Sequence, residues 1–139
     1  MEIRWGVLTD GPILSTVDQL ISAPKLMDAL AQSRILLALD GETLLGWLRF
    51  GWFWDQIPYI NLLYILDPYR RQGIGTGLMD AWEEAMLARG HPLVMTSTRV
   101  DEDAQHFYRK RGYRDAGALF LPDEPAELVL LKELAEKQR

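Results

Sequence analysis

A glycine-rich stretch in the middle of the chain has the residue types of an anion-binding turn. It runs Arg70-Arg71-Gln72-Gly73-Ile74-Gly75-Thr76-Gly77-Leu78, between an apolar segment and a segment of helical periodicity. Glycines let a ligand approach the backbone closely, and the N–H groups that open a helix favour an anion. Arg70 and Arg71 add positive charge. The stretch predicts a phosphate-binding turn, although the same glycines also suit a tight turn that binds nothing.

The spacing of the glycines excludes two common nucleotide-binding loops. A phosphate-binding loop of the Walker type needs Gly-Lys-Ser/Thr, and no Gly-Lys dipeptide occurs in the chain. A dinucleotide fingerprint opens the first βαβ unit with Gly-x-Gly-x-x-Gly. Here Gly73, Gly75 and Gly77 stand at every second position and lie in the middle of the chain.

Two motifs together carry a resemblance to a known superfamily. Residues 70–75 match Arg/Gln-x-x-Gly-x-Gly/Ala, and the residues ahead of them, 65–70, are similar to Val-x-Pro-x-Tyr-Arg with the proline displaced by one position. Downstream, residues 101–108 followed by Gly112-Tyr113 are similar to Asn-x-x-Ala-x-x-Phe-Tyr and Gly-Phe/Tyr, with Asp101 in place of the usual Asn. In this order, the motifs resemble those of the GNAT superfamily of acyl-CoA-dependent N-acetyltransferases. The resemblance covers nearly the whole chain.

The resemblance implies a site for acetyl-CoA as cosubstrate. In the family a bulge in the strand before the glycines leaves main-chain groups free to pair with the pantetheine arm, which here means Leu63, Tyr64 and Ile65. Packing of Leu63 and Ile65 in the core is compatible with this role. The pyrophosphate would be held by backbone N–H groups of Arg71, Gln72, Gly73, Ile74, Gly75 and Thr76. Arg70 adds charge, and Asp101 takes the motif's Asn position beside the cofactor.

Direct acetyl transfer needs an uncharged amine, a stabilised oxyanion and a proton for the departing thiolate. The resemblance implies that Tyr108 supplies the proton, although Tyr108 and Phe107 would also be expected to pack against the sheet. The oxyanion would be met by the N–H of Ile65. No general base is identified: the candidates are Asn61, Asp55, Glu102, Thr96, Ser97 and a chain of waters.

Aromatic residues gather on the hairpin ahead of the glycine turn: Trp47, Trp52, Phe53, Trp54 and Tyr59. Strand alternation predicts Trp52 and Trp54 on one face and Phe53 on the other, so part of the cluster is expected in the core. A Trp face beside Asp55 would suit an ammonium group by cation–π attraction. His91 and His106 lie far apart in the sequence, and no metal site is predicted.

The elements that must position these residues follow from apolar periodicity. Strands are expected at residues 3–8, 34–40, 43–54, 59–66, 93–97, 113–121 and 127–132. Helices are expected from Gly11 to residue 21, around 26–30, from Leu78 to Gly90 and from Asp101 to Gly112. The predicted fold class is α/β: one GNAT-like domain with a mixed, mostly antiparallel sheet of about seven strands and about four helices. The resemblance implies a splay between the fourth and fifth strands.

Charge order predicts how the helix from Asp101 is stabilised. Asp101, Glu102 and Asp103 are expected in its first turn and Arg109, Lys110 and Arg111 in its last, where each sign complements the helix dipole. Gly112 is expected to cap it. The charged tail, 133–139, is expected to fray.

Composition limits the function classes. The 139 residues, 48% of them hydrophobic, suit one domain over 1–139. A net charge of -5 argues against nucleic acid or an anionic membrane as partner and suits a cationic acceptor. No cysteine is present, which excludes disulfides and thiolate chemistry. No signal peptide or bilayer-length apolar run is found, so a cytoplasmic protein is expected.

These observations together predict an N-acetyltransferase that moves an acetyl group from acetyl-CoA directly to a primary amine, without a metal. The alternative is an acyl-CoA-binding regulatory module with little catalysis, which the missing base favours. The acceptor class stays open among polyamines, aminoglycosides, amino acids, and protein lysines or N-termini. Sheet edges and the final hairpin are consistent with a homodimer.

Overall fold

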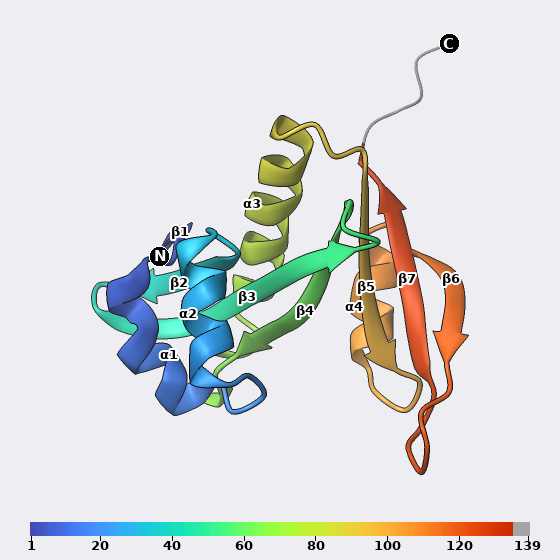
Figure 1. Ribbon diagram of the computed structural model, residues 1–139, viewed down its shortest axis with the longest axis horizontal. Helices are drawn as coiled ribbons and strands as arrows, with labels where there is room; N and C mark the ends of the chain where they lie inside the picture. The colour runs from blue at the N-terminus through green and yellow to red at the C-terminus, as the bar shows by residue number, and fades with distance from the viewer. Residues whose placement is uncertain (135–139) are drawn as a thin grey trace. The chain divides into compact units, whose positions relative to one another are not determined.

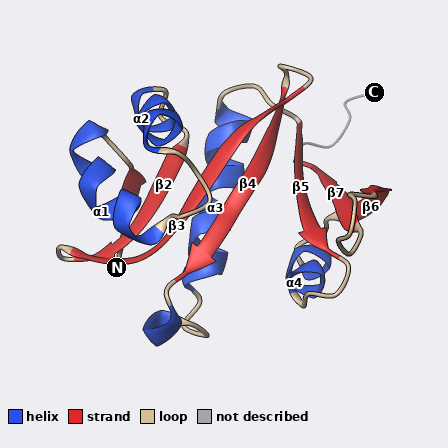
Figure 2. Ribbon diagram, turned by 60° about the horizontal axis from the view of Figure 1, so that its bottom comes forward, coloured by secondary structure: helices blue, strands red, loops and turns tan. Residues whose placement is uncertain are grey.

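The computed structural model describes residues 1–134 of the chain. Within them lie seven strands: β1 Glu2–Trp5, β2 Ile35–Asp40, β3 Thr43–Phe53, β4 Ile57–Ile65, β5 Leu93–Arg99, β6 Arg114–Leu119 and β7 Glu127–Glu133. The α-helices are α1 Gly11–Val17, α2 Ala23–Ala31, α3 Ile74–Ala88 and α4 Ala104–Lys110, and 3₁₀ turns lie at Leu8–Asp10 and Asp67–Tyr69. Figure 1 labels the helices and strands, and Figure 2 separates helix from strand by colour. None of the helices in this part of the chain is long and apolar enough to cross a bilayer.

The strands form a mixed sheet in the order β1-β2-β3-β4-β5-β7-β6. β2 pairs antiparallel with β1 and β3, and β7 pairs antiparallel with β5 and β6. The parallel pair is β4 with β5, through Tyr59↔Met95 and Ile60↔Thr96. The predicted fold class is confirmed, and so short a parallel pairing is what the expected splay requires.

The chain forms two compact units. The first comprises Met1–Phe50 and Leu62–Trp82, and the second comprises Gly51–Asn61 and the residues from Glu83 onwards. β3, β4 and α3 pass from one unit into the other, and each unit is described by itself below. The assignment of 1–139 to one domain stays a prediction, and most of the tail expected to fray lies outside the described residues.

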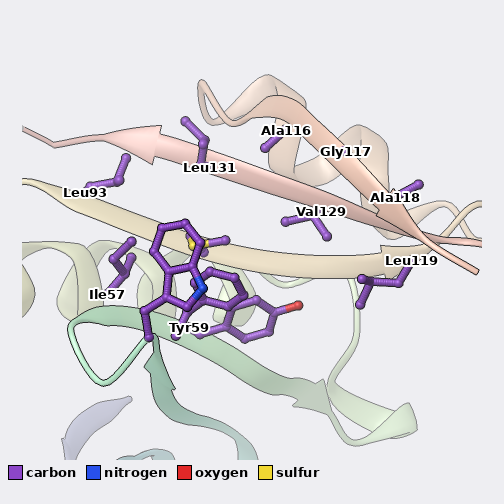
Figure 3. Close-up of a pocket in the computed structure, with 12 residues that line it drawn as sticks. Ile57, Tyr59, Leu93, Ala116, Gly117, Ala118, Leu119, Val129 and Leu131 are labelled. Carbon is purple, nitrogen blue, oxygen red and sulfur yellow. The ribbon is translucent and has the colours of Figure 1, made fainter.

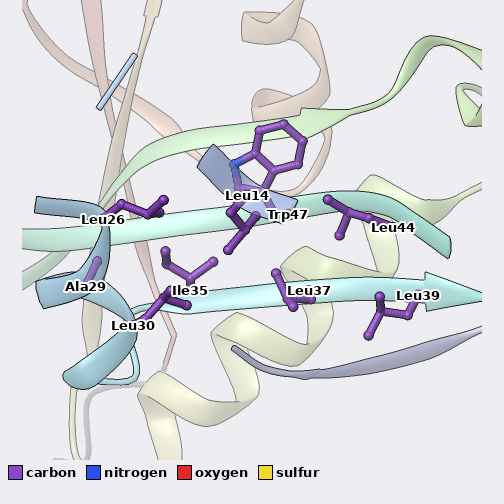
Figure 4. Close-up of a cluster of buried hydrophobic side chains, with 9 residues drawn as sticks. All are labelled: Leu14, Leu26, Ala29, Leu30, Ile35, Leu37, Leu39, Leu44 and Trp47. Atoms are coloured by element: carbon purple, nitrogen blue, oxygen red, sulfur yellow. The ribbon is translucent and has the colours of Figure 1, made fainter. Parts of the chain in front are cut away.

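The core of the first unit lies between the helices α1 and α2 and the strands β2 and β3 (Figure 4). Its buried side chains are Leu14, Leu26, Ala29, Leu30, Ile35, Leu37, Leu39, Leu44 and Trp47. In α2 the buried positions recur at helical spacing, so one apolar stripe faces the sheet.

Helix α1 ends earlier than its apolar pattern predicts. It stops at Val17 because Asp18 turns into the core, where its carboxylate accepts hydrogen bonds from Trp47 Nε1 at 3.2 Å and Arg49 Nε at 2.9 Å. Asp18 and Arg49 are both buried, so the pair satisfies two charges that would otherwise be costly to bury. Leu20, which falls within the predicted helix, lies beyond its end and is 79% exposed.

The first strand is also shorter than predicted. It ends at Trp5 because Asp10 binds the Arg4 guanidinium through two hydrogen bonds of 2.9 Å and accepts the Val7 N–H at 2.7 Å. These contacts cap a 3₁₀ turn at Leu8–Asp10, and residues 6–8, predicted as strand, lie outside β1.

In the second unit, β5, β7 and β6 lie side by side with α4 against β5 (Figure 1). The final hairpin is confirmed, with β6 and β7 antiparallel. Tyr113 Oη donates to Glu83 Oε2 at 2.9 Å and Lys132 Nζ donates to Glu83 Oε1 at 2.8 Å, so Glu83 is buried with partners. This network ties the start of the hairpin to the end of α3.

The predicted charge order of the fourth helix is half right. α4 begins at Ala104, so Asp101 and Glu102 precede it and its first turn carries no acidic residue. Both carboxylates instead lie against Arg99, at 2.8 and 3.4 Å from its guanidinium. The basic end is confirmed with Arg109 and Lys110 in the last turn. Gly112 follows with φ +95°, a conformation that glycine adopts without strain.

Candidate functional site

The glycine turn of the first unit places backbone donors at the start of α3. Its first helical hydrogen bond runs from Gly77 N–H to Gly73 O at 3.0 Å. The N–H groups of Ile74, Gly75 and Thr76 therefore precede the first intrahelical donor, have no acceptor within the helix and are available to an anion. Gly73 has φ +80°, and a Cβ built on it would have no atom within 4 Å. The turn is thus open where a phosphate would approach.

The two arginines of the turn have different surroundings. Arg70 donates from Nε to the Ile65 carbonyl at 2.9 Å, lies 3.2 Å from the Asp67 carboxylate, and places its guanidinium 5.1 Å from the centre of the Tyr64 ring. It therefore braces the end of β4 against the turn. Arg71 is exposed with φ +64°, and none of the hydrogen bonds or ion pairs within residues 1–134 involves its side chain. Arg71 is the arginine whose charge is available to a ligand.

The end of β4 carries the residues predicted to pair with pantetheine. Leu63 and Ile65 are half-buried, and the Tyr64 ring lies 5.3 Å from the Trp47 ring. Leu66 N–H donates to Leu45 O at 2.9 Å, which fixes this end of β4 on β3. Gly46 makes the approach feasible, because a Cβ there would lie 2.7 Å from the Tyr64 carbonyl oxygen. This requirement for glycine was not predicted from the sequence.

Tyr108 lies in the second unit, where α4 holds its ring in the core. The side chain is 4% exposed, and its ring packs edge-on against Phe107 and Tyr113, each at 5.3 Å. Burial raises the pKa of its hydroxyl to about 12, against a hydrogen bond with Thr96 that lowers it. Thr96 Oγ1 in turn donates to Ile60 O at 3.4 Å. Packing and proton donation are therefore compatible, because the ring packs while the hydroxyl keeps its proton at neutral pH.

The predicted site residues divide between the two units. Leu63–Ile65 and the residues of the turn, Arg70–Thr76, belong to the first, and Asp101 and Tyr108 belong to the second. Their roles stay predictions. The Asp101 carboxylate is engaged with Arg99 at 2.8 Å, as is that of Glu102, one of the candidate bases.

The remaining candidate bases have the following surroundings. Asp55 lies in a turn with φ +58°, and Asn61 is exposed. Ser97 shares a hydrogen bond with Tyr59. None of these surroundings singles out one base.

A cavity of about 600 Å³ in the second unit was not predicted (Figure 3). Phe53 and Trp54 both line it, with ring centres 4.7 Å apart. The predicted alternation is wrong here because β3 ends at Phe53 and Trp54 has φ +55°, which turns its ring to the side of Phe53. Trp52 instead packs on His91 at 5.2 Å. Among residues 1–134 no group of three or more His, Cys, Asp or Glu side chains is placed to hold a metal ion.

Comparison with known proteins gives a family match over most of the chain. A sequence model described as the Acetyltransferase (GNAT) family matches residues 12–113. A curated relative, the uncharacterized protein YyaT of Bacillus subtilis (strain 168), is 30% identical over 78 residues. That match covers 55% of this chain and 50% of the relative, so the chain spans about half the length of the curated protein it matches.

Solved structures share the fold at low sequence identity. Ard1 from Thermoplasma volcanium is 18% identical with a TM-score of 0.83, over 97% of this chain and 98% of that one. The ribosomal-protein-S18-alanine N-acetyltransferase of Escherichia coli is 15% identical with a TM-score of 0.81, over 99% and 96%. The structure of yncA from Salmonella typhimurium, solved with its cofactor acetyl-CoA, is 11% identical with a TM-score of 0.82, over 100% and 96%.

Proposed function

This chain belongs to the GNAT family of acetyltransferases, and from that premise we propose that it transfers the acetyl group of acetyl-CoA directly to a primary amine of a small molecule or a protein. The observation that carries the proposal is the turn before α3. Its first N–H groups lack intrahelical acceptors, and the space beside Gly73 is open. These features fit a pyrophosphate.

Each group of the proposed site has a role that its surroundings support. Acetyl-CoA, when bound, would supply an acyl thioester, which is already activated toward an amine. The N–H groups of Ile74, Gly75 and Thr76 hold phosphate oxygens, and Arg71 adds a positive charge. Tyr108 keeps its proton at neutral pH because burial raises the pKa of its hydroxyl to about 12, so the hydroxyl is a donor and not a base. No metal enters the proposal.

Thiol release with a panel of primary amines tests this function. Coenzyme A release is expected to exceed the no-amine blank with at least one amine, and mass spectrometry of the product should show one acetyl group on nitrogen. Tight binding of coenzyme A with thiol release at the blank level for every amine would contradict the proposal. That result would favour an acyl-CoA-binding regulatory module.

The remaining parts of the proposal concern partners. The amine acceptor is a small molecule or a peptide, and the net charge of -5 supports leaving nucleic acid and membranes out. Strand β6 is at the edge of the sheet and all six of its residues are exposed, which supports pairing with a second copy in a homodimer. Action in the cytoplasm remains a proposal that rests on the sequence.

Substitutions of the two arginines of the turn are expected to affect ligand binding differently. Arg71→Asn keeps a residue that tolerates positive φ and removes a charge, so coenzyme A should bind about twofold to fivefold more weakly while pantetheine, which has no phosphate, binds as before. Arg70→Gln removes the brace on Ile65 and should weaken both ligands. Calorimetry measures all four affinities. Equal losses for both ligands in Arg71→Asn would show that Arg71 acts through the backbone and not through phosphate.

A further inference from the structure

The cavity of about 600 Å³ lies wholly within the second unit and has almost entirely apolar walls. Leu93 and Met95 of β5 and Val129 and Leu131 of β7 form one side, which Ala116–Leu119 of β6 extends. The size is in the range of cavities that enclose drug-sized ligands, about 300–1,000 Å³. A group that fills it must be uncharged and apolar over most of its surface.

Aromatic rings form the opposite wall. The Phe53 and Tyr59 rings are stacked, with centres 6.1 Å apart and planes 19° from parallel, and the Trp54 ring adjoins Phe53. Trp54 is 76% exposed although it is the largest of the three. Trp54 and Asp55 both have positive φ, which costs non-glycine residues about 1–2 kcal/mol each. These are the two central residues of the turn that joins β3 to β4, which Gln56 N–H closes by donating to Phe53 O at 3.1 Å, and the turn leaves the Trp54 indole exposed beside the cavity.

Polar groups gather at one end of the cavity. Figure 3 shows the Tyr59 hydroxyl directed away from Ile57 and toward Leu119. There the hydroxyl shares a hydrogen bond with Ser97. Burial is the main cause of the raised pKa of Tyr59, and the negative charge of the nearby Glu127 carboxylate raises this pKa further. Glu127 pairs with Leu119 in β6 and, by strand alternation, faces the same side of the sheet as Val129 and Leu131.

The Glu127 carboxylate has no cationic partner among residues 1–134. Arg99, opposite Glu127 in the β5–β7 register, makes its ion pairs with Asp101 and Glu102. Across that same part of the chain, no hydrogen bond or ion pair involves the side chain of Glu127. Glu127 is not itself part of the cavity wall, but it is the β7 partner of Leu119, which is. A half-buried carboxylate beside that end of an apolar cavity is complementary to a ligand with one cationic group and an apolar body.

The predicted proton donor reaches the same stretch of β5 from the opposite face of the sheet. Ser97 shares the cavity face with Met95, whereas Thr96, between them, faces the other side and hydrogen-bonds Tyr108. The pairing of β4 with β5 reaches Thr96 through Ile60↔Thr96. An amine held beside Ser97 would thus stand one residue along β5 from Thr96, with Thr96 and Tyr108 on the opposite face of the strand.

We propose that this cavity binds the acceptor, and that the acceptor is a hydrophobic primary amine whose apolar body lies against Trp54 and Phe53 and whose ammonium group meets Glu127. The inference rests on the proposed function and narrows its acceptor class. Polyamines and aminoglycosides carry several charges, which these walls would leave without partners.

Calorimetry without acetyl-CoA tests the cavity directly, with 2-phenylethylamine as probe. It is expected to bind at least about tenfold more tightly than 2-phenylethanol, which lacks the charge, or putrescine, which lacks the apolar body. Glu127→Gln should weaken 2-phenylethylamine about tenfold to a hundredfold, because an ammonium–carboxylate contact is lost, and leave 2-phenylethanol unchanged. Glu124→Gln, in the exposed turn before β7, is the matched control and should bind as wild type.

The apolar wall has its own pair of variants. Trp54→Ala should weaken both phenyl probes, whereas Trp52→Ala, which removes an indole that packs on His91 outside the cavity, should not. Both side chains are partly exposed, so both variants are expected to fold, and circular dichroism checks this. Equal binding of 2-phenylethylamine by Trp54→Ala and wild type would overturn the proposal.

Turnover separates this proposal from the proposed function. If putrescine is acetylated while 2-phenylethylamine neither binds nor reacts, the enzyme stands and the hydrophobic acceptor is wrong. If 2-phenylethylamine binds through Glu127 and no amine is acetylated, the cavity is an amine-binding site but the proposed acetyltransferase function, and with it the role of the amine as acceptor, is wrong. A dimer in sedimentation that Trp54→Ala dissociates, with no binding of the amine, would assign the cavity to a second copy and overturn the proposal.

Discussion

Tyr108→Phe is expected to slow the acetyl-transfer step by about a hundredfold or more while coenzyme A affinity stays at the wild-type level. General acids contribute about a hundredfold to ten-thousandfold, and a thiolate is a good leaving group, which favours the lower end. Phe keeps the edge-on packing with Phe107 and Tyr113 and removes only the hydroxyl that Thr96 contacts. Single-turnover kinetics at saturating amine isolates this step from product release.

The control for this experiment is Tyr113→Phe. Tyr113 is buried beside Tyr108, but its hydroxyl donates to Glu83 at 2.9 Å, so its loss removes a bond to a charged group. Tyr113→Phe should therefore lower the free energy of unfolding by about 1.5–3 kcal/mol and leave the transfer rate unchanged. The opposite pattern, a normal rate in Tyr108→Phe, would make Tyr108 a packing residue.

The pH dependence of the loss gives a second check. The pKa of the Tyr108 hydroxyl is raised to about 12, so the acid is protonated throughout the range from about pH 6 to 9. The ratio of wild-type to Tyr108→Phe rates should then be flat across that range. A ratio that fell toward 1 near pH 9 would mean that the hydroxyl loses its proton there, contrary to its burial.

Local patterns predicted most of the elements because their information is local. Apolar, β-branched and aromatic runs bounded by turn residues placed the seven strands, and helical spacing placed α3, with errors mainly at the ends. The large errors come from side-chain hydrogen bonds and ion pairs that apolar periodicity does not show, distant in one case and local in the other. α1 ends at Val17 because Asp18 is held by Arg49, 31 residues away, and α4 starts late because Arg99 engages Asp101 and Glu102.

The candidate site also has a part that local sequence motifs indicate and a part that only the fold brings together. The glycine turn and Tyr108 lie on contiguous motifs, so the sequence alone could indicate them. The cavity has walls from β4, β5, β6, β7 and the end of β3, and the polar groups beside it, Tyr59, Ser97 and Glu127, are connected by no motif. The positive φ of Trp54 is equally invisible to a rule of alternation. The local signal for the cavity in the sequence was the aromatic cluster beside Asp55, which suggested a site for an ammonium group but not the strands that form it.

Gly75→Val is expected to weaken coenzyme A binding by at least about a hundredfold, because several N–H contacts to charged oxygens depend on the same open approach and each contributes about 1.5–3 kcal/mol. Gly75 is the better position than Gly73, whose φ of +80° would strain any side chain and confuse folding with binding. Gly75 lies in the first turn of α3, where valine has a higher helix propensity than glycine, so thermal stability should change little.

The matched control is Ala88→Val, which places the same side chain at the exposed last residue of α3. Calorimetry should show wild-type affinity for coenzyme A in Ala88→Val and a loss only in Gly75→Val, with both proteins folded by thermal unfolding. Wild-type affinity in a folded Gly75→Val protein would show that the phosphates of coenzyme A do not bind at this turn. The reason is steric: a valine side chain at position 75 cannot share the space that a phosphate needs in order to reach the N–H groups of Ile74 and Thr76. The glycines would then serve a tight turn alone, and the coenzyme would have to bind elsewhere.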